Sequence, residues 1–438
     1  MRRFLLLGHR WLGLTLAGFL IVIGATGSVI AFFPELDRWA NPGLLTVAPE
    51  GPQLDALALR ERMAALDPRA HVYYLHFPDT GESFSAYVEG AIDPATGEAF
   101  DIGYDEVFAD PHTGERLGKR MWGNFSLQRP DWFTQLYFLH YSLVLPEALG
   151  EGFMGIVALL WALDCLVAFG LTLPRRGKRL GADAATRRSW WTRWAPAWKL
   201  KLGAGTNRVV FDWHRASGLW LWPMLLVFAW SGFALNLPGV YQSVMQRIVH
   251  IEDIEHPPKL AEPLTEPAVG WHEALSLGER HMAQQAQQQG FEVLRPWALI
   301  YRRETGTWYY RVLSSRDVTR HGMTAVAIDA SSGALRGVAI PTGHRAGDTF
   351  TSWIKALHMA MVFGMPMRIF VSACGLLVVA LTVTGVMIWW RKRRMRSQAG
   401  TRRSGLRGEA IDAAGTALAA PSSASRPAQA KLNKPPAV

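Results

Sequence analysis

Four histidines beside long apolar runs are the residues of this chain best suited to do chemistry: His9, His140, His214 and His358. Ionisable side chains at membrane depth are costly and usually mark a pathway or a cofactor. Two imidazoles that face each other across a cavity can take both axial positions of a haem iron, and such a haem transfers electrons rather than activating oxygen. The four histidines therefore predict two bis-histidine haem sites, with these residues as the iron ligands.

The apolar runs beside them predict four transmembrane helices, because a hydrocarbon core of about 30 Å needs about 20 apolar residues in a helix. We expect an α-helical membrane bundle with a large α+β domain after the first and after the third helix. The predicted segments are helices at 1–33, 151–174, 213–237 and 367–390, α+β domains at 34–150 and 238–366, a basic loop at 175–212 and a disordered tail at 391–438.

The position of the positive charge predicts the orientation. The net charge is +10, and its Lys and Arg residues gather before the first run, in the loop at 175–212 and directly after the fourth run. Positive residues mark the cytoplasmic side of a membrane protein. Both termini are therefore expected in the cytoplasm, with the segments 34–150 and 238–366 in the periplasm of a bacterium and the helices in its inner membrane. This charge distribution argues for a membrane lipid partner and against nucleic acid.

An internal repeat relates the two halves. His9-Arg10 and His214-Arg215 open the first and third runs with an offset of 205 residues, and a glycine of each run keeps the same offset. The segments 34–150 and 238–366 each begin with a helical pattern and continue with alternating strands that end in a glycine turn. The sequence thus predicts a duplicated unit.

Topology favours one pairing of the histidines. The first and third helices run in one direction and the second and fourth in the other, so equivalent histidines are expected at the same depth. His9 is therefore predicted to pair with His214, and His140 with His358. Gly13, Ala17 and Gly218 are expected to leave room for a flat macrocycle near the first pair.

Other side chains leave two interpretations open. Asp164 in the second helix is either a proton relay or a buried hydrogen-bonded carboxyl. Arginines and a lysine near the histidines either bind haem propionates or anchor the helices at the interface; these are Arg10, Arg215, Arg345, Lys355 and Arg368. Cys165 and Cys374 are interpreted as packing residues, and the nine remaining histidines as surface residues.

The motifs together resemble those of the PepSY-associated transmembrane proteins. These motifs are the His-Arg-Trp-x-Gly-Leu opening at His9, the strand and turn at Val107–Gly118, and the histidines that precede helices with basic ends. The resemblance covers roughly residues 1–395. It implies an iron-regulated inner-membrane protein, with two b-type haems (haem b) held by histidine pairs as in the ferric-siderophore reductases of the family.

Two classes of function follow from these observations. The first is a haem-dependent membrane oxidoreductase that takes electrons from quinol or a soluble reductase and reduces a periplasmic acceptor. The resemblance implies that this acceptor is a ferric siderophore. The alternative is a non-enzymatic membrane protein whose periplasmic domains bind or regulate a protease or peptide; a transporter built from parallel repeats is a weaker rival, because four helices are few for it.

Overall fold

The computed structural model describes residues 1–49, 51–123, 126–174, 189–251, 254 and 257–418, with only the backbone described for Glu147 and residues 399–418. The chain divides into two compact units, residues 1–385 and 386–438. The first unit contains the histidines and the sheet.

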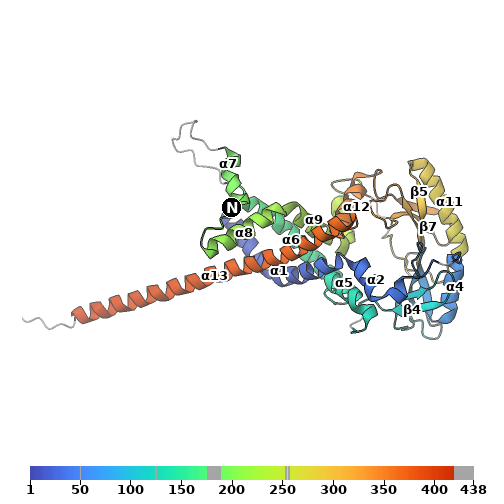
Figure 1. The fold of residues 1–438 in the computed structure, drawn as a ribbon, viewed down its shortest axis with the longest axis horizontal. Coiled ribbons are helices and arrows are strands. Elements are labelled where there is room, and N and C mark those ends of the chain that lie inside the picture. The colour runs from blue at the N-terminus through green and yellow to red at the C-terminus, as the bar shows by residue number, and fades with distance from the viewer. Residues whose placement is uncertain (50, 124–125, 175–188, 252–253, 255–256, 419–438) are drawn as a thin grey trace, which may run out of the picture. The chain divides into compact units, whose positions relative to one another are not determined.

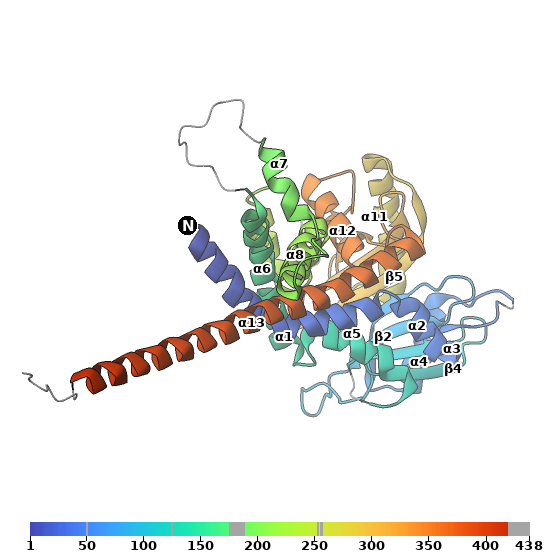
Figure 2. The same ribbon diagram turned by 60° about the vertical axis from the view of Figure 1, so that its left-hand side comes forward.

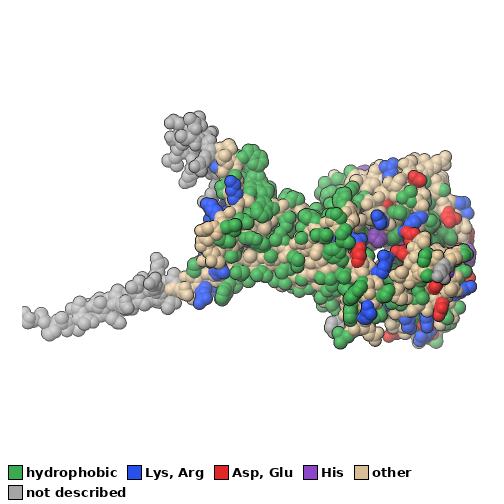
Figure 3. Space-filling model, in the orientation of Figure 1, with side chains coloured by type: hydrophobic (Ala, Val, Ile, Leu, Met, Phe, Trp, Pro, Cys, Tyr) green, Lys and Arg blue, Asp and Glu red, His purple; other side chains and the backbone are tan. Residues whose placement is uncertain are grey.

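Among the described residues, three helices are long and apolar enough to cross a membrane: α1 (Arg2–Ile30), α6 (Glu147–Thr172) and α13 (Gly364–Leu418). Leu, Ile, Val and Ala dominate their apolar stretches, and a helix satisfies every backbone hydrogen bond within the segment, as lipid requires. Hydrophobic side chains cover much of the visible helical surface, whereas charged side chains gather over the strands (Figure 3).

The third apolar run is a broken helix. It consists of α8 (Thr206–Trp220) and α9 (Trp222–Asn236), which meet at an angle of 67°. Pro223 explains the break, because proline has no backbone N–H and its ring clashes with the carbonyl four residues earlier. The expected helix at 213–237 is therefore not one straight span. The described part of the chain has three candidate membrane-spanning helices, or up to four if the bent pair is taken as one span.

The structure also departs from the expected disordered tail. α13 continues to Leu418, since residues 391–418 contain no proline and are rich in good helix formers such as Ala and Arg. The remaining part of the predicted tail, 419–438, and residues 175–188 of the basic loop lie outside the described residues.

The strands of the two intervening segments form one eight-stranded antiparallel sheet, in the order β4-β3-β2-β1-β5-β6-β7-β8. The two halves meet where β1 pairs with β5, with Leu75 opposite Leu299. The two predicted α+β domains thus share one sheet. The strands are β1 (Ala70–His76), β2 (Phe84–Gly90), β3 (Glu106–Ala109), β4 (Arg116–Arg120), β5 (Val293–Arg302), β6 (Thr307–Ser314), β7 (Thr324–Asp329) and β8 (Leu335–Ala339).

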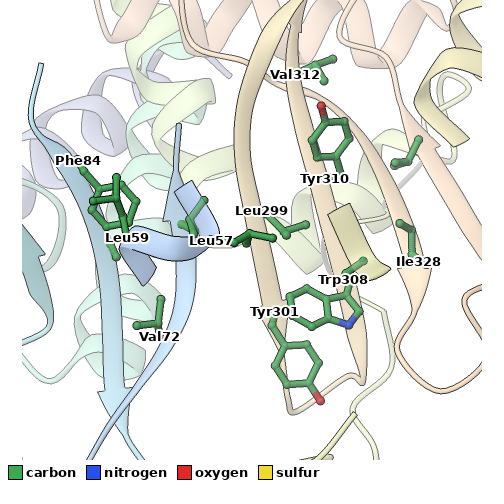
Figure 4. Packing of buried hydrophobic residues seen from close by; sticks show 14 of the residues in the cluster. Leu57, Leu59, Val72, Phe84, Leu299, Tyr301, Trp308, Tyr310, Val312 and Ile328 are labelled. Carbon is green, nitrogen blue, oxygen red and sulfur yellow. The ribbon is translucent and has the colours of Figure 1, made fainter. Parts of the chain in front are cut away.

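One face of this sheet is covered by α4 (Ala56–Leu66) and α11 (Trp271–Gln289), one helix from each segment (Figure 1). Side chains alternate along a strand, so Leu299 and Tyr301 of β5 join this core while Ala298 and Ile300 point to the opposite face. Figure 4 shows the shared core, with side chains of both segments in it.

Short helices connect the sheet to the long ones. α5 (Trp132–Ser142) precedes α6 and packs on α1, and α12 (Ala346–His358) precedes α13 and packs on α9. Figure 2 shows α5 beside α1. The other short elements are α2 (Phe33–Ala40), α3 (Pro42–Leu45), α7 (Trp190–Trp194), α10 (Pro238–Met245) and the 3₁₀ turns Arg129–Asp131 and Ala195–Trp198.

Candidate functional site

His9 and His214 lie next to each other, although 205 residues separate them in sequence. The His9 ring projects from α1 and the His214 ring from α8, and their centroids are 6.3 Å apart with an interplanar angle of 49°. The structure therefore brings together the first pair that the sequence predicts.

His140 and His358 form a second pair. Their ring centroids are also 6.3 Å apart, and the rings are nearly perpendicular at 86°. Each histidine lies in the last turn of a short helix, α5 or α12, that ends before a long apolar helix begins. Residues with positive φ follow both helices: Leu143, Val144, Ala360 and Phe363. These turns separate the histidine-bearing helices from α6 and α13.

The rings of the first pair are oriented by hydrogen bonds to the second long helix of their own half. Nδ1 of His9 is 2.9 and 3.0 Å from the carboxylate oxygens of Asp164 in α6. Nδ1 of His214 is 3.0 Å from the carbonyl oxygen of Leu381 and 3.1 Å from Oγ1 of Thr384 in α13. A carboxylate and a carbonyl oxygen can only accept, so both rings donate Nδ1–H.

The second pair is held by two hydroxyls. Nδ1 of His140 is 3.0 Å from Oγ1 of Thr26, and Nδ1 of His358 is 2.6 Å from Oγ of Ser231. Each hydroxyl donates its proton to a carbonyl four residues earlier in its own helix, at 2.8 Å for Thr26 and 2.6 Å for Ser231. With that proton committed, each hydroxyl accepts Nδ1–H from the histidine.

All four imidazoles therefore carry their proton on Nδ1 and keep the Nε2 lone pair. Within the described residues no hydrogen bond involves an Nε2 atom of the four. A metal-bound histidine has this arrangement, in which the second ring nitrogen donates to a partner that fixes the ring.

The separation of the rings fits two axial ligands of one metal. A metal–imidazole bond of about 2.0 Å on each side, with ring centres about 1.1 Å beyond the nitrogens, gives centres about 6 Å apart. The described residues contain no group of three or more His, Cys, Asp or Glu side chains that could hold a bare metal ion. Two imidazoles suit a metal that brings its other ligands with it, as a haem does.

Glycines lie against two of the rings. A Cβ atom on Gly27 would come within 2.9 Å of Cε1 of His140, and one on Gly385 within 3.2 Å of Cε1 of His214. Of the residues expected to leave room near the first pair, Gly13 has no contact within 4 Å of its Cβ position from elsewhere in the described residues. Gly218 instead packs against Leu381 at 3.6 Å.

The ionic side chains that the sequence left open are now placed. Asp164 is the buried partner of His9. Arg215 binds Asp212 and the carbonyls of Pro196 and Ala197, so it supports the loop before α8.

Two further arginines have acidic partners: Arg368 pairs with Glu35, and Arg345 pairs with Asp348. The buried Nε of Arg10 has no hydrogen-bond partner among the described residues. Cys165 and Cys374 are buried free thiols, as packing residues are.

A cavity of about 580 Å³, which no sequence motif predicts, lies on the face of the sheet opposite α4 and α11. It is bounded by strands of both segments and by the helices α10 and α12. Its polar lining includes His76, His321, Arg311, Tyr241 and Lys355.

Trp297 stands between the two histidines of this cavity, with ring centroids 4.8 Å from His76 and 5.3 Å from His321. Burial lowers the pKa of His76 to about 4, and the nearby Arg295 guanidinium contributes to the shift. His71, His76, His112 and His281 are half-buried, so the prediction of nine surface histidines is wrong for these four; His250, His272, His321 and His344 are exposed, and His256 lies outside the described residues. The pairing of β1 with β5 creates this site, and no local sequence signal reports it.

The fold and the paired histidines define an α-helical membrane protein with an antiparallel sheet outside its apolar helices. The chain belongs to the family of the PepSY-associated TM region, because the model of that family matches residues 6–392. No curated protein matches the chain.

Proposed function

We propose that the protein is a di-haem b oxidoreductase of the bacterial inner membrane, with both termini in the cytoplasm. The observation that carries the proposal is the presence of two histidine pairs, each with ring centroids 6.3 Å apart. In both pairs Nδ1 is engaged and Nε2 is left for a ligand.

His9 and His214 would hold one haem, and His140 and His358 the other. Each haem, when bound, would supply reversible one-electron exchange. The protein's own contribution is to hold each ring in one tautomer and one orientation. Asp164, Thr26, Ser231 and the carbonyl of Leu381 do so.

The cavity on the sheet is the proposed place for the electron acceptor. Lys355, Ala356 and Met359 of the cavity wall flank His358 on α12 and just after it, so the cavity adjoins the helix that carries a proposed ligand. Its volume of about 580 Å³ lies in the range of small-molecule sites, about 300–1,000 Å³. We propose a ferric siderophore as the acceptor, because hard oxygen ligands hold ferric iron more tightly than ferrous iron.

The electron donor is proposed to be quinol or a soluble reductase on the cytoplasmic side. Lys and Arg side chains gather near α7 and α8 (Figure 3). Positive residues mark the cytoplasmic side of a membrane protein, which supports placing this end of the helices in the cytoplasm.

Absorption spectroscopy of the purified full chain tests the proposal. We expect a Soret band, a sharp α-band after reduction, and two haems b per chain. The matched control replaces His9, His140, His214 and His358 together with Ala, and it should fold without haem. A folded wild-type protein that stays colourless when expressed with sufficient haem would remove the proposal and leave the non-enzymatic alternative.

A further inference from the structure

The two histidine pairs differ in one respect that the repeat does not predict. Three of the four Nδ1–H groups donate to neutral oxygens: Oγ1 of Thr26, Oγ of Ser231 and the carbonyl of Leu381. His9 alone donates to a carboxylate, that of Asp164, with both oxygens within 3.0 Å of Nδ1. The Asp164 side chain is 11% exposed, so little solvent screens its carboxylate.

We infer that Asp164 lowers the reduction potential of the His9–His214 site below that of the His140–His358 site. The inference rests on the proposed function. Asp164 is a positioning residue, since it acts through His9.

Two physical effects point in the same direction. A carboxylate that accepts the Nδ1–H proton raises the basicity of the imidazole, so Nε2 becomes a stronger donor. The carboxylate also places a negative charge near the metal, and negative charge favours the oxidised, more positive form. Hydrogen bonding and local charge are among the means by which a protein sets a haem potential.

The neutral partners of His140 and His358 raise the basicity of the imidazoles less than a carboxylate does, and they place no negative charge near the metal. Thr26 and Ser231 accept Nδ1–H with hydroxyl oxygens whose own protons are given to backbone carbonyls. These hydrogen bonds fix the ring and its tautomer without adding a charge. At equilibrium the His140–His358 site is therefore the one that is reduced first.

An optical redox titration of the full chain with both haems bound tests the inference. Wild type should give two one-electron waves. Asp164→Asn keeps an oxygen acceptor for His9 but removes the charge, so the lower wave should rise. We expect at least a tenfold change in its reduction equilibrium, about 59 mV for one electron. The upper wave should stay in place, and Asp164→Glu should keep the lower wave close to its wild-type position.

A second variant tests the effect of a carboxylate partner on the reduction potential of the His140–His358 site. Thr26→Asp offers His140 a carboxylate, and the upper wave should fall by a similar factor. Two unmoved waves in Asp164→Asn overturn the inference. If Asp164→Asn does not retain its haem, an unmoved upper wave in Thr26→Asp overturns it. A wild-type protein without haem would contradict the proposed function itself. Unchanged reduction potentials in the variants of a di-haem protein would contradict only the role of Asp164.

Discussion

Ser231 accepts a hydrogen bond from His358 over 2.6 Å, while its own proton goes to the carbonyl of Val227. This arrangement fixes the tautomer of the histidine, so the hydroxyl matters to a ligand on Nε2 although it lies on the other side of the ring.

Ser231→Ala should weaken haem binding at the His140–His358 site by about 10–100-fold, because ligand orientation and basicity depend on such partners. Ser231→Thr should retain the haem. The measurement is haem titration into the apoprotein, followed by absorbance. Ser217→Ala is the matched control, since Ser217 makes the same hydrogen bond to a carbonyl four residues earlier in α8 and none to a histidine among the described residues. Equal affinities for the Ser231→Ala and Ser217→Ala variants would contradict the role of Ser231.

Gly27 lies so close to His140 that a methyl group there would displace the ring. The added Cβ would come within 2.9 Å of Cε1 and 3.4 Å of Nδ1. Gly27→Ala is therefore expected to break the hydrogen bond with Thr26 and to reduce haem occupancy from two per chain towards one.

Gly18→Ala is the control for this variant, because Gly18 lies in the same helix and no other part of the chain that the structure describes comes within 4 Å of its Cβ position. Haem per chain, measured as the pyridine haemochrome, distinguishes the two. Full occupancy in Gly27→Ala would show that the ring tolerates the methyl group and that the contact does not limit the site.

His76 should make the stability of the sheet depend on pH. Burial lowers its pKa from 6.5 to about 4. Between these pH values an unfolded His76 is protonated and the folded one is not, so the free energy of unfolding falls as the pH is lowered through this window. The loss is at most about 3 kcal/mol, with no further contribution from His76 below about pH 4.

His76→Gln should flatten part of this dependence in thermal unfolding followed by circular dichroism. His272→Gln, at an exposed position of α11, should leave it unchanged. A His76→Gln protein with the same loss of melting temperature between pH 7 and pH 4.5 as wild type would rule out this contribution.

Arg120 neutralises two buried carboxylates at the edge of the sheet. Its guanidinium is 2.6 Å from Glu106 and 2.9 Å from Asp37 of α2, and all three side chains are at most 5% exposed. Arg120→Met leaves both carboxylates buried without their cation, so we expect a loss of about 3–5 kcal/mol in the free energy of unfolding.

Urea unfolding of the full chain in detergent measures this loss. Arg38→Met removes an exposed ion pair with Glu82 and should change stability by less than about 1 kcal/mol. Similar effects of the two substitutions would mean that the buried cluster is not important for stability.

The sequence predicted the positions of the histidines and their proximity because the repeat places equivalent residues at equivalent depths. The same offset of 205 residues also relates the two hydroxyls that orient His140 and His358, since Thr26 corresponds to Ser231. The break in the third helix was foreseeable from Pro223.

Other features depend on contacts that no local pattern reports. The hydrogen bond between His9 and Asp164 joins residues 155 positions apart, and two interpretations of Asp164 were equally compatible with its place in an apolar helix. The pairing of β1 with β5 merges the strands of two segments into one sheet. Alternation predicts each strand, but which strand edges meet is decided by the tertiary fold.

The central claim is that each haem is held by one histidine from each half of the chain. Haem content and reduced α-bands of the four single variants His9→Ala, His214→Ala, His140→Ala and His358→Ala test it most directly. We predict that the first two variants lose one and the same spectral component and the last two lose the other. Loss of the same component in His9→Ala and His358→Ala, with the other component intact, would contradict the claim.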